Sequence, residues 1–108
     1  KADHALTFKL DLSRGADQMS DLPDTVRAYR RTTKFPSAGI PPALLNDHET
    51  KEGVWGVINV VSGSLRYHIP SRNESHMLRP GHPGIVEPTI AHRVEPIGDA
   101  TFFIEFYR

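Results

Sequence analysis

Alternating apolar and polar side chains dominate the chain, and this period of two predicts strands rather than helices. Residues 64–69 alternate strictly, and residues 101–107 are dense in aromatic and β-branched side chains. Residues 54–61 are apolar on both faces, as in a strand at the centre of a sandwich or barrel. Because glycine and proline separate these short strands at regular intervals, the pattern predicts an all-β sandwich or barrel.

Turn-forming residues set the expected order of the strands. A Ser-Gly pair at 62–63 predicts a tight turn, which would fold the two neighbouring strands into a hairpin. A proline and glycine stretch at 96–99 predicts another turn before the last strand. The prolines between residues 35 and 42 predict a loop or an edge strand, because proline cannot donate a ladder hydrogen bond.

The first part of the chain differs from the rest. Residues 1–23 carry one alternating stretch at 6–12 followed by polar residues, so we expect an N-terminal extension with a pairing strand and then a loop. A flexible leader is the alternative. Residues 24–108 are expected to form one barrel domain, since the chain has the commonest domain size. The absence of an initial methionine is consistent with removal of a leader, a tag or an upstream domain.

Composition narrows the expected partners and compartment. Lys plus Arg (13) equals Asp plus Glu (13), so neither nucleic acid nor a membrane surface is an expected partner. A short basic cluster at 27–34 is interpreted as a solvated edge. No apolar run approaches the roughly 20 residues of a membrane span. Cysteine is absent, which fits a reducing compartment, and we expect a cytoplasmic protein.

Two histidines are the leading candidates for chemistry. His48 lies in a polar octet, 46–53, and His92 lies in the strand-like segment GIVEPTIAHRV at 84–94. If the strands form a jelly roll, both imidazoles reach one cavity. With a carboxylate they would make a common set of ligands for a divalent metal. A histidine that only makes structural hydrogen bonds is the alternative for each.

Glu105 is the expected third ligand. It shares a strand face with two aromatic residues, and a carboxylate is costly among apolar walls unless it is paired or bound to a metal. The alternatives are a partly wet face or an ion pair with Arg66 or Arg93. Lys51 is a candidate for orienting an anion. Glu52 and Glu87 are the other candidates for the third ligand, and both are interpreted, like Glu49, as surface residues.

Three stretches, at 41–69, 80–96 and 102–108, carry a resemblance to small cupins. More narrowly, the chain resembles the family that includes the N-terminal domain of tellurite-resistance B proteins and the YeaR-like proteins. The resemblance implies a cupin-type double-stranded β-helix, which is a jelly-roll barrel. It also implies a link to tellurite resistance or the stress response, although the family's activity is poorly defined.

The chain departs from the general cupin pattern in two places. Of the first motif's two histidines and one glutamate only His48 is present, and the glutamate position falls near Gly56. The second motif keeps His92 but has Thr89 in place of its glycine. The resemblance therefore carries over His92 most directly, then His48. It supports Glu105 only through the family's acidic residue in the last strand.

These observations predict a small-molecule-binding cupin that depends on one divalent metal: zinc, iron, manganese or nickel. Its ligands would be His48, His92 and Glu105, and whether it is an enzyme stays open. The alternative is a non-catalytic sensor or binding domain for a ligand or an oxyanion, with no metal requirement. The expected partners are a small, anionic molecule and a second copy, in a homodimer formed by strand exchange or sheet packing.

Overall fold

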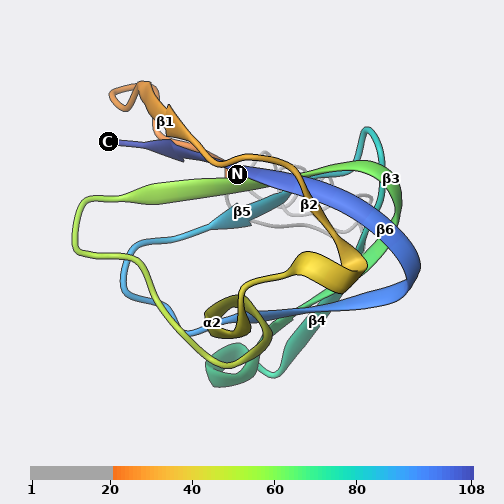
Figure 1. Cartoon of the computed structure of the whole chain (residues 1–108). Coiled ribbons are helices and arrows are strands. Elements are labelled where there is room, and N and C mark those ends of the chain that lie inside the picture. Colours follow the sequence, from red (N-terminus) through yellow and green to blue (C-terminus); the bar gives the residue numbers. More distant parts are fainter. Residues whose placement is uncertain (1–20) are drawn as a thin grey trace, which may run out of the picture.

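The computed structural model describes residues 21–108, and this part of the chain is an antiparallel β fold. The predicted all-β class is therefore confirmed. Two strands of 15 residues, β3 (Trp55–Ile69) and β6 (Arg93–Tyr107), pair with each other along nearly their whole length. Four shorter strands pair with these two: β1 (Ala28–Arg31), β2 (Phe35–Pro36), β4 (Glu74–Leu78) and β5 (Gly84–Val86). In Figure 1, β3 and β6 bend together and run back beneath themselves, so the sheet curls around its own core.

Helical segments are short and lie between strands. Their bounds are η2 (Ser37–Gly39), α2 (Pro42–Leu45) and η3 (Pro70–Arg72). Both α2 and η3 start at proline, whose fixed φ suits the first helical position. Among residues 21–108, none of the helices has the length and apolar character needed to cross a membrane. The predicted strand at 6–12 lies outside the described residues, and the division at residue 23 stays a prediction.

The predicted hairpin at 62–63 is wrong, because β3 passes straight through these residues. The register of β3 against β6 shifts here, with Ser62 opposite Thr101 and Ser64 opposite Ile97. Gly63 has φ +77°, and a Cβ atom on it would lie 2.1 Å from the carbonyl oxygen of Asp99. The two expected turns therefore face each other and form a single corner, where both strands bend without reversing.

The core lies inside the curl, between the two long strands. The N-terminal part of β3 pairs with β5 and its C-terminal part pairs with β4, so β3 contributes side chains to both ends of the core. The most deeply buried large side chains are Ile58, Leu65, Tyr67, Leu78 and Phe102. Burial of an apolar side chain of this size contributes about 1.5–3 kcal/mol.

Candidate functional site

His48 and His92 lie against each other, as the sequence predicts. Their backbones form an isolated antiparallel bridge, in which the N–H of each residue donates to the carbonyl of the other, at 3.0 and 2.8 Å. The ring centroids are 4.2 Å apart with an angle of 53° between the planes. The bridge joins the polar loop 46–53 to the segment before β6, and it fixes both imidazoles at one place.

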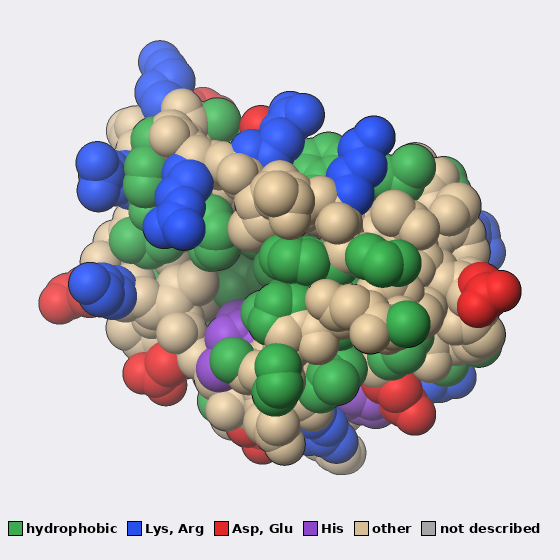
Figure 2. Space-filling view, in the orientation of Figure 1, with side chains coloured by type: hydrophobic (Ala, Val, Ile, Leu, Met, Phe, Trp, Pro, Cys, Tyr) green, Lys and Arg blue, Asp and Glu red, His purple; other side chains and the backbone are tan. Residues whose placement is uncertain are grey.

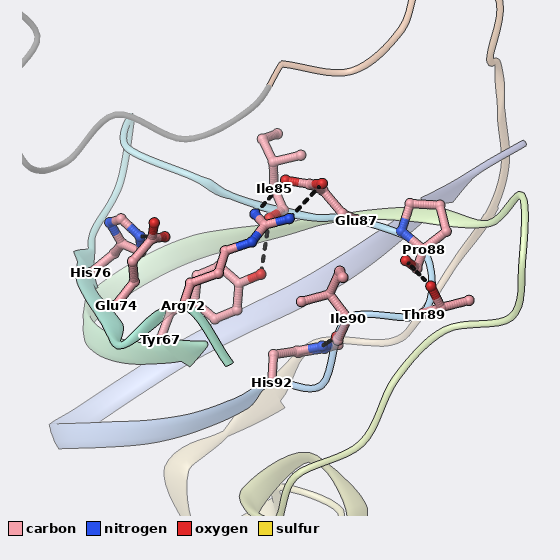
Figure 3. A network of polar contacts seen from close by, with 10 residues as sticks. All are labelled: Tyr67, Arg72, Glu74, His76, Ile85, Glu87, Pro88, Thr89, Ile90 and His92. Carbon is pink, nitrogen blue, oxygen red and sulfur yellow. Dashed lines mark hydrogen bonds and ion pairs between the residues drawn. The ribbon is translucent and has the colours of Figure 1, made fainter. Parts of the chain in front are cut away.

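The two rings have matching hydrogen bonds. His48 Nδ1 lies 3.1 Å from the carbonyl oxygen of Asn46, and His92 Nδ1 lies 3.0 Å from that of Ile90. Figure 3 shows the second of these contacts. A carbonyl oxygen only accepts hydrogen bonds, so each Nδ1 carries the proton. In the neutral ring, Nε2 then presents a lone pair.

Neither Nε2 atom has a hydrogen-bond partner among residues 21–108. In that part of the chain, the buried side-chain polar atom without a partner is Nδ1 of His76, so Nε2 of His48 and Nε2 of His92 are reachable from outside. Burial lowers the pKa of His92, whose residue is 4% exposed. The contact with Ile90 partly opposes this effect, and the neighbouring His48 adds to it. His92 is therefore neutral at pH 7 and accepts hydrogen bonds.

The histidine pair lines a pocket of about 470 Å³. Val86 of β5 and Ile104 and Phe106 of β6 supply apolar side chains to its walls, and four charged side chains also line it. Figure 2 shows histidine side chains beside a hollow with hydrophobic walls, with Lys and Arg side chains nearby. The lining residues are Tyr29, Arg30, Leu44, His48, Glu49, Thr50, Lys51, Val54, Gly56, Val86, His92, Ile104, Phe106 and Arg108.

Cations predominate at the pocket mouth. Arg30 lies over the Phe106 ring, with Cζ 6.0 Å from the centroid, and Arg108 lies over Tyr29, with Cζ 4.0 Å away. These aromatic contacts hold the guanidinium groups without using their N–H donors in hydrogen bonds. Within residues 21–108, no carboxylate pairs with either arginine. With Lys51, the lining holds three cations against the single carboxylate of Glu49, so its field favours anions.

Glu105 lies away from the histidine pair. Its neighbours Ile104 and Phe106 face the pocket, so strand alternation sends Glu105 to the opposite face of β6. There its carboxylate accepts hydrogen bonds from Arg31 at 3.0 Å and from the Tyr107 hydroxyl at 3.1 Å. The expected alternative, an ion pair, is therefore present, but its partner is Arg31 and not Arg66 or Arg93.

A second set of contacts braces the strand that leads to His92. Arg72 donates to both carboxylate oxygens of Glu87, at 2.6 and 2.9 Å, and the Tyr67 hydroxyl donates to the Ile85 carbonyl at 2.9 Å (Figure 3). Burial raises the pKa of Tyr67, which stays a neutral donor. The Tyr67 ring meets His92 edge-on, with centroids 5.8 Å apart. These contacts help to fix the wall of the pocket.

The sequence identifies one cation of the pocket, Lys51, and misses the two arginines. Arg30 belongs to the basic cluster that the sequence assigns to a solvated edge, and the sequence pattern gives Arg108 no role. Arg30 and Arg108 reach the same pocket because Arg27 and Arg108 exchange backbone hydrogen bonds at 3.1 Å. These bonds hold the start of β1 beside the end of β6. One local signal was present, since Tyr29-Arg30 and Tyr107-Arg108 are both tyrosine–arginine pairs.

Comparisons with known proteins identify a matching protein family. A family model described as "TehB-like domain" matches residues 30–104. A relative from Haemophilus influenzae, named "Probable S-adenosyl-L-methionine-dependent methyltransferase TehB", is 30% identical over 76 residues, which are 66% of this chain and 27% of the relative. The chain thus spans about a quarter of the length of that relative.

Two solved structures are similar to this fold. The crystal structure of TehB from Haemophilus influenzae matches with a TM-score of 0.70 and 27% identity, over 78% of this chain and 32% of that chain. A protein from Escherichia coli strain K12 matches with a TM-score of 0.74 and 21% identity, over 83% of this chain and 97% of that chain. The second likeness shows the fold alone.

The predicted divalent-metal cofactor, and with it the metal-dependent cupin function and the metal-binding site, are corrected by these findings. The relatives are named as probable methyltransferases that depend on S-adenosyl-L-methionine, so the cofactor in their names is that molecule and not a metal. In the part of the chain that the structure describes, no three His, Cys, Asp or Glu side chains are grouped to hold a metal ion. Glu105, the expected third ligand, faces away from the pair.

The pocket does not suit S-adenosylmethionine either. That molecule carries a sulfonium cation, and the three cations of the lining oppose a positive ligand. The chain is thus similar to part of a probable methyltransferase, but the charge of the pocket beside His48 and His92 does not fit the cofactor in that relative's name. Because the family model covers residues 30–104, well over half of the sequence, the chain belongs to the TehB-like domain family.

Proposed function

We propose that this TehB-like domain binds a small anionic molecule in the pocket of His48 and His92. We propose further that this molecule is the substrate of a methyltransferase that depends on S-adenosylmethionine. The observation that carries the proposal is the pocket itself, with apolar walls, two open Nε2 atoms and arginines that have no carboxylate partner within residues 21–108. The domain's part is to hold the molecule on which such an enzyme acts.

The charge of the pocket supports an anion. Arg30 and Arg108 are positioned by aromatic rings, so little side-chain entropy is lost when they contact a ligand. Their field is only partly offset by Glu49. A volume of about 470 Å³ lies in the range of small-molecule sites. The size of the pocket therefore fits a small molecule, and its charge favours an anion.

The proposal also includes the cupin-type fold, the homodimer and the cytoplasmic location. We retain the cupin-type double-stranded β-helix, and its support is the corner at which β3 and β6 bend together. We also retain the homodimer and the cytoplasmic location. The support for the homodimer is strand β1, which lies at the edge of the sheet with four exposed residues and has an outer edge free to pair with a second chain.

Calorimetric titration of the full chain with a panel of small anions tests the proposed function. The panel contains carboxylates, phosphate, sulfate and selenite. We expect one class to bind, and a double variant, Arg30→Gln with Arg108→Gln, to bind at least about 10-fold more weakly, because two unpaired cations are removed.

Arg79→Gln is the matched control, since this exposed arginine lies outside the pocket lining. It should bind as the parent protein does. No binding by any anion in the panel would contradict the proposed function. Equal weakening by the control variant would show that only net charge matters.

A further inference from the structure

The hydrogen-bond pattern of the two histidines restricts the ligand further. Each Nδ1–H is used by a backbone carbonyl, so each neutral ring offers the pocket an acceptor and no donor. Protonation would turn Nε2 of a ring into a donor, but the tilted rings are 4.2 Å apart and three cations line the same pocket. Positive charge on the rings would be repelled by these cations. The buried His92, whose pKa is lowered by burial, therefore offers the pocket an acceptor.

An anion without a hydrogen-bond donor can pair with the cations of the pocket but not with the acceptors of the histidines. A carboxylate can accept hydrogen bonds from Arg30 or Arg108, but it cannot donate to Nε2 of His48 or His92. The lone pair of the buried His92 would then receive no donor from the ligand. An amine could donate to them, but its positive charge is opposed by the arginines. An anion that also carries an O–H or S–H group satisfies both ends.

We infer that the pocket selects small anions that carry a hydroxyl or thiol group, such as 2-hydroxy acids or mercapto acids, with the anionic end at the arginines and the O–H or S–H group donating to the histidine pair. The carbon skeleton then contacts Val86, Ile104 and Phe106 in the apolar walls. This inference rests on the proposed function and deepens it, because a hydroxyl or a thiol is also a nucleophile that a methyltransferase can alkylate.

The test compares ligands that differ by one hydroxyl or thiol group, using calorimetric titration of the full chain at pH 7.5. The probes are mandelate against phenylacetate, and 3-mercaptopropionate against propionate. We expect the hydroxyl or thiol compound of each pair to bind about 10-fold more tightly or better, because the analogue leaves the acceptors unpaired. His92→Phe keeps a ring and removes one of the two acceptors, so it should reduce this preference.

A second measurement keeps the inference testable if His92→Phe does not fold. Nitrogen-15 NMR of the histidine rings should show a change at Nε2 of His48 or His92 with mandelate and a smaller one with phenylacetate. Equal binding of the two members of each pair would overturn the inference and leave anion binding intact. Failure of these probes and of the whole anion panel would overturn both the inference and the proposed function.

Discussion

At the scale of single residues, His92 constrains the chemistry of the pocket most. It is held by a backbone bridge to His48, by the Ile90 carbonyl and by the edge of the Tyr67 ring. Burial lowers its pKa below the usual 6.5. The residue therefore supplies a neutral acceptor at a fixed place, which a solvent-exposed histidine would not do.

This lowered pKa predicts a dependence of stability on pH. The unfolded chain binds the His92 proton more readily than the folded protein does, so the stabilising contribution is complete above about pH 6.5 and is lost as the pH falls through the lower folded pKa. Urea denaturation at about pH 7.5 and about pH 5 should show this loss, and His92→Gln should reduce it. His82→Gln, at an exposed histidine, should leave the loss unchanged. An identical loss in His92→Gln and the parent would contradict the assignment.

Sequence reasoning at this scale found the histidine pair and misplaced Glu105. The histidines could be predicted because proline and strand patterns marked the segments that carry them. The face shared by Glu105 with its aromatic neighbours was also predictable from alternation. Its partner was not, because Arg31 lies 74 residues away and comes close only through the pairing of β1 with β6.

At the scale of elements, the corner in β3 and β6 decides the shape of the molecule. A Ser-Gly pair signals a backbone with positive φ, which suits both a tight turn and a bulge. The local sequence cannot distinguish between them, since the difference lies in the partner strand. Here residues 97–101 of β6 bend around Gly63, and both strands continue as one ladder.

The corner gives a matched pair of substitutions. Gly63→Ala would place Cβ 2.1 Å from the Asp99 carbonyl oxygen at φ +77°, so we expect destabilisation of about 2 kcal/mol or more. Gly98→Ala meets a similar φ, +65°, with no atom within 4 Å, so its cost should be only about 1 kcal/mol. Thermal and urea unfolding measure both. Equal costs would mean that the strands do not pack closely at this corner.

At the scale of the whole molecule, the same fold forms about a third of one similar protein and nearly all of another. It matches 32% of the TehB chain from Haemophilus influenzae and 97% of a protein from Escherichia coli. The all-β class could be predicted from period-two alternation alone. The two arginines of the pocket could not, because their approach depends on β1 and the end of β6 meeting across most of the chain.

The central claim is that the pocket of His48 and His92 is an anion site. The most direct measurement is an NMR titration of the full chain with mandelate, following backbone amides and arginine Nε–H signals. We expect saturable changes in the NMR signals of the pocket residues alone, with the changes at Arg30, Arg108 and His92 among the largest. Changes centred on the exposed face of Arg31 and Glu105, or no saturable change with mandelate or with any anion of the panel, would contradict it.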